Sequence, residues 1–79
     1  MIIAKLMYVT ESEKDYVTAA RQKIGLDFEL TRIIPKEPAI FSQINSECTI
    51  QTSIIESIEI TEENIVVISK NTKYFFKMI

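Results

Sequence analysis

The residues that could carry chemistry in this chain are one cysteine and a few neighbouring carboxylates. Cys48 has no histidine to activate it, because the 79 residues include none, and a free cysteine without such a partner is usually an inert packed residue. The pairs Glu56/Glu59 and Glu62/Glu63 could in principle act as acid and base. They fall in a strand edge and a turn, where carboxylates serve mainly solubility. We therefore expect no catalytic residues and no enzyme activity.

A metal centre or a nucleotide cofactor is not expected either. Without histidine, one cysteine cannot build a tetrahedral zinc site. The single glycine cannot form the glycine-rich turn of a dinucleotide- or phosphate-binding loop. The sequence therefore predicts no metal and no cofactor.

One short segment near the C-terminus combines basic and aromatic residues. Lysines interleaved with aromatic side chains can neutralise phosphates and stack on bases, so one hypothesis makes Lys70, Lys73, Tyr74 and Lys77 contacts to nucleic acid. The competing interpretation is that these lysines protect a last strand against edge-to-edge pairing. The net charge of −2 gives the whole chain no attraction for a polyanion.

An apolar strip on the last strands predicts an interface instead. If the segments 48–60, 64–69 and 73–79 form a meander, the face turned away from its core also carries apolar side chains. Either the rest of the chain covers this strip, or it binds a partner protein or a second copy of the chain. The strip consists of Ile55, Val66, Ile68 and Phe75.

Size and composition limit the class of protein. With 79 residues, 47% hydrophobic and 25% charged, we expect a single ordered domain spanning residues 1–79. The apolar runs are shorter than the roughly 20 residues that cross a membrane. One unpaired cysteine and an N-terminus without a cleavage site favour a cytoplasmic location.

The first half of the chain predicts a strand, a helix and a second strand. Residues 2–9 are apolar at both even and odd positions, which indicates a central strand covered on both faces. Residues 10–24 carry a capping box, Thr10 with Glu13, followed by an apolar stripe, and Gly25 is a natural stop. Residues 26–34 alternate as a half-buried strand. Residues 38–45 fit either a short helix or an irregular loop.

The last third predicts an antiparallel meander with turns near residues 61–64 and 70–73. A two-residue turn at Asn71-Thr72 would place Val67 opposite Phe76. Independently, a turn at 61–64 would place Ile60 opposite Ile65 and Ile58 opposite Val67. Both registers turn the same residues toward the core, namely Ile58, Ile60, Ile65, Val67, Tyr74, Phe76 and Met78.

The C-terminal third also resembles the tail of short uncharacterised proteins of Gram-positive bacteria and their phages. The matching positions are Thr52, Ser53, Asn71, Thr72 and Tyr74, with Ser69 where threonine is usual. The resemblance implies a small accessory or phage-borne protein and assigns no site.

Together these features predict an α+β fold, in which one helix packs on an antiparallel sheet that ends in a three-stranded meander. The leading functional hypothesis is a non-enzymatic cytoplasmic module that binds another protein, forms a homodimer and acts as a phage-borne inhibitor of a host protein. The alternative is a small β-barrel-like protein that binds single-stranded nucleic acid through its last hairpin. We expect no membrane partner.

Overall fold

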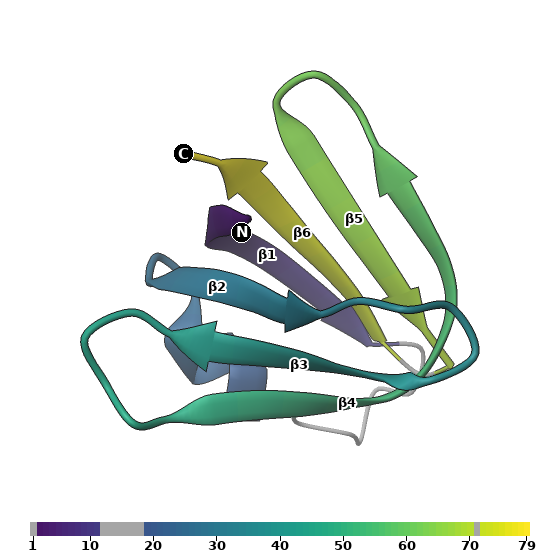
Figure 1. Ribbon diagram of the computed structural model, residues 1–79, viewed down its shortest axis with the longest axis horizontal. Coiled ribbons are helices and arrows are strands. Elements are labelled where there is room, and N and C mark those ends of the chain that lie inside the picture. Colours follow the sequence, from purple (N-terminus) through teal and green to yellow (C-terminus); the bar gives the residue numbers. More distant parts are fainter. Residues whose placement is uncertain (1, 12–18, 71) are drawn as a thin grey trace.

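Six antiparallel strands closed into a barrel make up the fold. The computed structural model describes residues 2–11, 19–70 and 72–79. Each strand pairs with the next along the chain, and the last pairs with the first, so the sheet closes on itself (Figure 1). The strands are β1 (Ile3–Glu11), β2 (Asp27–Arg32), β3 (Pro38–Gln43), β4 (Thr49–Ile60), β5 (Asn64–Ser69) and β6 (Thr72–Met78).

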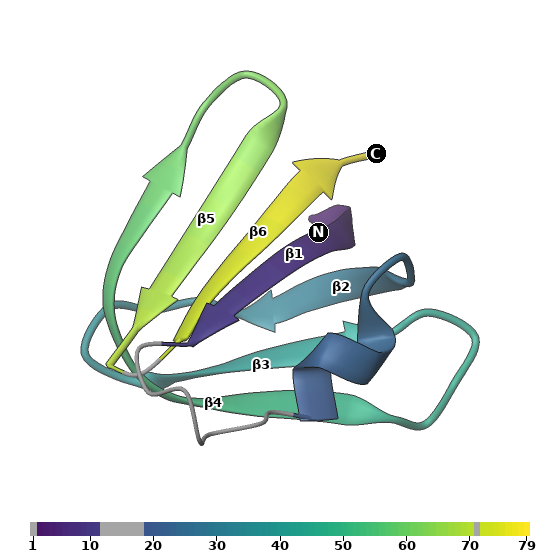
Figure 2. The ribbon, with the colours of Figure 1, turned by 180° about the vertical axis from the view of Figure 1, so that it is seen from behind.

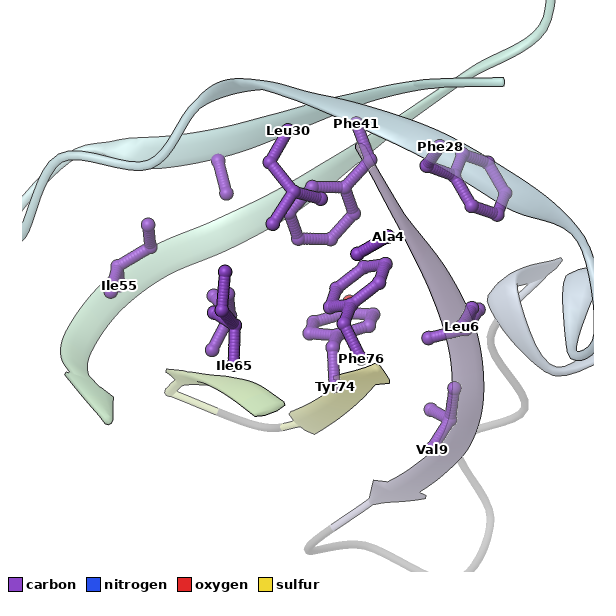
Figure 3. Close-up of a cluster of buried hydrophobic side chains, with 12 residues drawn as sticks. Ala4, Leu6, Val9, Phe28, Leu30, Phe41, Ile55, Ile65, Tyr74 and Phe76 are labelled. Carbon is purple, nitrogen blue, oxygen red and sulfur yellow. The ribbon is translucent and has the colours of Figure 1, made fainter. Parts of the chain in front are cut away.

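Inward side chains from all six strands fill the barrel. The ring of Phe41 lies edge-on to Tyr74 and Phe76, at centroid distances of 5.3 and 4.9 Å, and Phe28 contacts Phe76 at 6.4 Å. Figure 3 shows these side chains converging from facing strands. A six-stranded barrel is narrow enough for its own side chains to fill. The buried apolar core comprises Ala4, Leu6, Val9, Phe28, Leu30, Ala39, Phe41, Ile55, Ile65, Val67, Tyr74 and Phe76.

The long strand β4 forms a corner of the barrel. Its first half pairs with β3 and its second half with β5. The register shifts between Ile55 and Ser57, and such a bulge bends and twists a strand. Figure 1 shows β4 running beside β3 before it rises next to β5. One strand therefore belongs to both walls of the barrel.

The predicted α+β fold is wrong, because the chain is a closed barrel and its described residues contain no α-helix. Thr10 is not a helix cap: β1 continues through it, pairing Thr10 with Lys73 and Glu11 with Thr72. Glu13, the other half of the predicted capping box, lies outside the described residues. Ala19–Lys23 forms a short 3-10 helix, η1, which Figure 2 shows as the coil leading into β2.

The predicted stop at Gly25 has a structural counterpart. Gly25 follows η1 with a φ of +94°, which glycine adopts at little cost. Its N–H donates to the carbonyl of Leu6 at 2.7 Å, which ties the turn to β1. Within the described ranges, no helix is long and apolar enough to span a bilayer.

Residues 38–43 form the strand β3, which neither predicted alternative included. Ala39 and Phe41 point into the core, and Pro38 and Ile40, which alternate with them, are half-buried. This period of two suits a strand, although Pro38 had suggested a helix start. Pro38 instead occupies the first position of the strand, where its missing N–H is tolerated. The sequence predicted that a helix would pack on the meander and cover its core face. The strands β2 and β3 cover that face instead.

The C-terminal meander is confirmed, with one correction of register. Ile58 pairs with Val67 and Ile60 with Ile65, as predicted. Across the β5–β6 turn, however, Val67 faces Tyr74 rather than Phe76. The last pair before that turn is Ile68 with Lys73, so the connection is two residues longer than expected. A shift of two residues keeps each side chain on its face.

Candidate functional site

A β-bulge in β1 determines which aromatic side chains reach the surface. In the β1–β6 ladder, Leu6 pairs with Phe76 and Tyr8 with Phe75, so Met7 is an extra residue on the β1 side. Met7 and Tyr8 both point outward, 48% and 57% exposed. A bulge redirects the side chains that follow it. The prediction that both faces of this strand are covered is therefore wrong.

The bulge brings Tyr8 against Phe75 on the outside of the barrel. Their ring centroids are 5.7 Å apart and their planes are tilted by 46°. Phe75 is half-buried between Tyr8 on one side and its ladder partner Val66 on the other. The ring that the sequence left without a place in the core thus belongs to an exposed aromatic pair.

Lysines flank this pair along β6. Lys73 and Lys77 lie two residues before and after Phe75, on the same outward face, and both are exposed. Same-face neighbours on a strand are about 7 Å apart. The aromatic pair therefore has an ammonium group within side-chain reach on either side.

A third lysine extends the basic surface onto β1. Lys5 lies directly opposite Lys77 in the ladder, and like charges in that position destabilise a sheet. Asp27 lies 3.8 Å from the Lys5 ammonium group, but both side chains are partly exposed, and such surface pairs contribute little. Lys5 and Lys77 therefore place two positive charges on neighbouring strands, one of them beside Asp27.

The charges of the chain are segregated around this face. All 11 acidic residues lie outside segments 1–10 and 64–79, and these segments contain four of the nine basic residues. The two segments supply β5, β6 and all but the last residue of β1. Glu11, the last residue of β1, pairs with Thr72 of β6. On the neighbouring strands, Asp27 pairs with Lys5 and Glu59 pairs with Val66. The strands β1, β5 and β6 therefore carry three lysines, Lys5, Lys73 and Lys77, and one acidic residue at the end of β1. We call this outer surface of β5, β6 and β1, carrying Lys5, Tyr8, Val66, Ile68, Lys73, Phe75 and Lys77, the basic aromatic face.

The structure separates the members of the predicted apolar interface. Val66, Ile68 and Phe75 are half-buried on the basic aromatic face. Ile55 is fully buried in the core, because the bulge after it changes which residues of β4 point inward. Its backbone also exchanges two hydrogen bonds with the β2–β3 turn, at Lys36 and Glu37. Ile55 does not belong to that strip.

The predicted nucleic-acid contacts also need one replacement. Lys70, Lys73 and Lys77 are exposed, but Tyr74 is only 4% exposed and packs on Phe41, so it cannot stack on a base. Tyr8 provides the outward ring instead. Strict alternation groups Tyr8 with the inward residues of β1, and no feature of that pattern reveals the bulge.

The remaining candidates form no cluster. Cys48 is exposed in the β3–β4 turn, where its N–H donates to the Ser46 hydroxyl at 3.2 Å. The four glutamates considered as acid–base pairs are all exposed. Among the residues that the structure describes, no three His, Cys, Asp or Glu side chains are placed to hold a metal ion.

Several positions that carry the C-terminal resemblance are structural. The Thr52 hydroxyl accepts from the Ala39 N–H at 2.9 Å and donates to the Ser53 carbonyl at 2.6 Å. The Ser69 hydroxyl donates to the Thr72 carbonyl at 2.8 Å and accepts its N–H at 3.2 Å. Thr52, Ser69 and Thr72 are buried polar residues, and such residues require these partners. Their pattern thus specifies strand and turn geometry.

The chain matches no protein-family model, and no curated protein or solved structure is significantly similar to it. Its function must therefore be inferred from its own surface chemistry.

Proposed function

We propose that this chain is a non-enzymatic binding protein that holds nucleic acid on its basic aromatic face. The observation that carries the proposal is the Tyr8–Phe75 pair, turned outward by a bulge and flanked by lysines. Aromatic rings stack on bases, and lysines neutralise phosphates. The charge of the three contributing strands supports the same partner, because β1, β5 and β6 carry three lysines and one acidic residue, Glu11 at the end of β1.

The experiment is a titration of fluorescently labelled oligonucleotides, followed by anisotropy, across a range of salt concentrations. Binding should weaken as salt rises, because each neutralised phosphate releases counterions. Replacing Lys73 or Lys77 with glutamine should lower the slope of log affinity against log salt by about 0.7 each for a single strand. Lys36→Gln is the matched control: it removes the same charge from the exposed β2–β3 turn.

Two outcomes would refute the proposal. The first is no binding at low salt, where phosphate contacts are strongest. The second is an equal loss of affinity in Lys36→Gln and Lys77→Gln, which would mean that total charge matters rather than this face.

A protein partner is the second candidate, favoured by the apolar side chains on the same face. Val66 and Ile68 lie beside Phe75 across the β5–β6 ladder, and an apolar centre with a charged rim is typical of protein interfaces. A homodimer is the simplest version, and inhibition of another protein is a further one. Light scattering after size-exclusion chromatography tests self-association. If the wild type and Phe75→Lys are both folded monomers, the homodimer is wrong.

A further inference from the structure

The residues of the β6–β1 ladder form three rows across the barrel surface. Lys77 and Lys5 are opposite one another, Phe75 is opposite Tyr8, and Lys73 is opposite Thr10. Opposite residues on one face have Cβ atoms roughly 5 Å apart. The aromatic row therefore runs across the strands, with a row of two ammonium groups beside it.

Resting on the proposed function, we infer that this face binds single-stranded nucleic acid through two consecutive bases, one on Tyr8 and one on Phe75. The strand crosses β6 and β1 along the aromatic row. Its phosphates lie over the row formed by Lys77 and Lys5. Lys73, on the other side of the rings, contacts the next phosphate along the strand.

Only a single strand can use the aromatic row. In a duplex the bases are stacked on one another and present their edges in the grooves, so their faces are closed to an outward-pointing ring. Unpaired bases offer a face to any aromatic side chain, with little dependence on sequence. Without the rings, a duplex would be held by the lysines alone. The footprint of two bases follows from the two adjacent outward-pointing rings, the exposed Tyr8 and the half-buried Phe75, whose centroids are 5.7 Å apart.

The test compares three unlabelled competitors of equal length against a labelled single strand, at low salt. They are the same single strand, its duplex, and an abasic strand with the same phosphates but no bases. We expect the single strand to compete at least tenfold better than the abasic strand, and better than the duplex per phosphate. Tyr8→Leu and Phe75→Leu should each weaken single-strand binding about 5- to 150-fold and leave abasic binding unchanged.

Lys77→Gln is the complementary variant, because it should weaken the single strand and the abasic strand by the same factor. Circular dichroism and urea unfolding confirm that each variant is folded. Equal binding of all three competitors, unaffected by Tyr8→Leu, would overturn the two-base inference and leave nucleic-acid binding by this face intact. No binding of any competitor would overturn both.

Discussion

The adjacent residues Phe75 and Phe76 provide the sharpest test of the barrel, because they point to opposite sides of one strand. Phe76 is 1% exposed and packs edge-on against Phe28 and Phe41. Phe75 is half-buried, and among the described residues its ring contacts that of Tyr8. The same substitution at two successive positions should therefore have very different costs.

The expected magnitudes follow from burial. Phe76→Ala removes a fully buried ring and leaves a cavity, which costs about 3–5 kcal/mol. Phe75→Ala removes a partly exposed ring and one tilted aromatic contact, which together amount to about 1 kcal/mol. A domain of 79 residues has a total stability of about 4–12 kcal/mol. Phe76→Ala should thus consume a large share of the stability, and Phe75→Ala only a small one.

Urea unfolding followed by circular dichroism measures the difference through the transition midpoints. If Phe76→Ala is unfolded in buffer, the variants Phe75→Leu and Phe76→Leu give the same comparison with a smaller loss of stability. Phe76 should again be the more sensitive position. Equal destabilisation at the two positions, or a larger loss at Phe75, would show that β6 does not present Phe76 to the core. The face assignment on which the proposed function depends would then fail.

Three further predictions test the buried polar contact, the glycine turn and the exposed thiol. Thr52→Val should cost about 1–3 kcal/mol in urea unfolding, because it leaves the buried Ala39 N–H without an acceptor, whereas Thr49→Val on the exposed part of the same strand should be near neutral. Gly25→Ala should cost about 1 kcal/mol through its positive φ alone, since no atom of the described residues lies within 4 Å of the added Cβ; an unchanged midpoint would contradict this conformation. Cys48 should react with a thiol reagent as quickly in buffer as in urea, because it is exposed in a turn, and strong protection in buffer would show that the β3–β4 turn is covered.

The meander was predictable because its evidence is local. Alternation fixed which side chains of 64–69 and 72–78 point inward, and short turns fixed which strands are neighbours. The geometry of the turn was harder to predict from the sequence. The predicted two-residue turn at Asn71-Thr72 was wrong, yet Tyr74 and Phe76 lie in the core as predicted. A register error of two residues preserves the faces, so the predicted core residues of β5 and β6 were right although their pairs were not. On β4 the reverse holds for Ile60, which pairs with Ile65 as predicted but is 62% exposed rather than in the core.

The helix prediction was wrong where local and tertiary preferences compete. Thr10 suits a helix cap, but its place in β1 opposite Lys73 extends the pairing that closes the barrel. Closure itself could not be predicted from the chain, because the pairing of the first and last strands joins residues more than 60 positions apart. Once closed, the barrel supplies its own covering layer, and a helix is not required for that purpose.

Core packing explains why Tyr8 is outside, so its exposure alone says nothing about function. The interior already holds the rings of Phe28, Phe41, Tyr74 and Phe76, and another inward ring would overfill it. The bulge places the smaller Val9 inside instead. Packing does not explain the lysines that surround the displaced ring, because lysine beside lysine in a ladder is unfavourable. The functional inference therefore rests on the combination of an aromatic pair that the core excludes and the lysines beside it, Lys73 and Lys77 on β6 and Lys5 on β1.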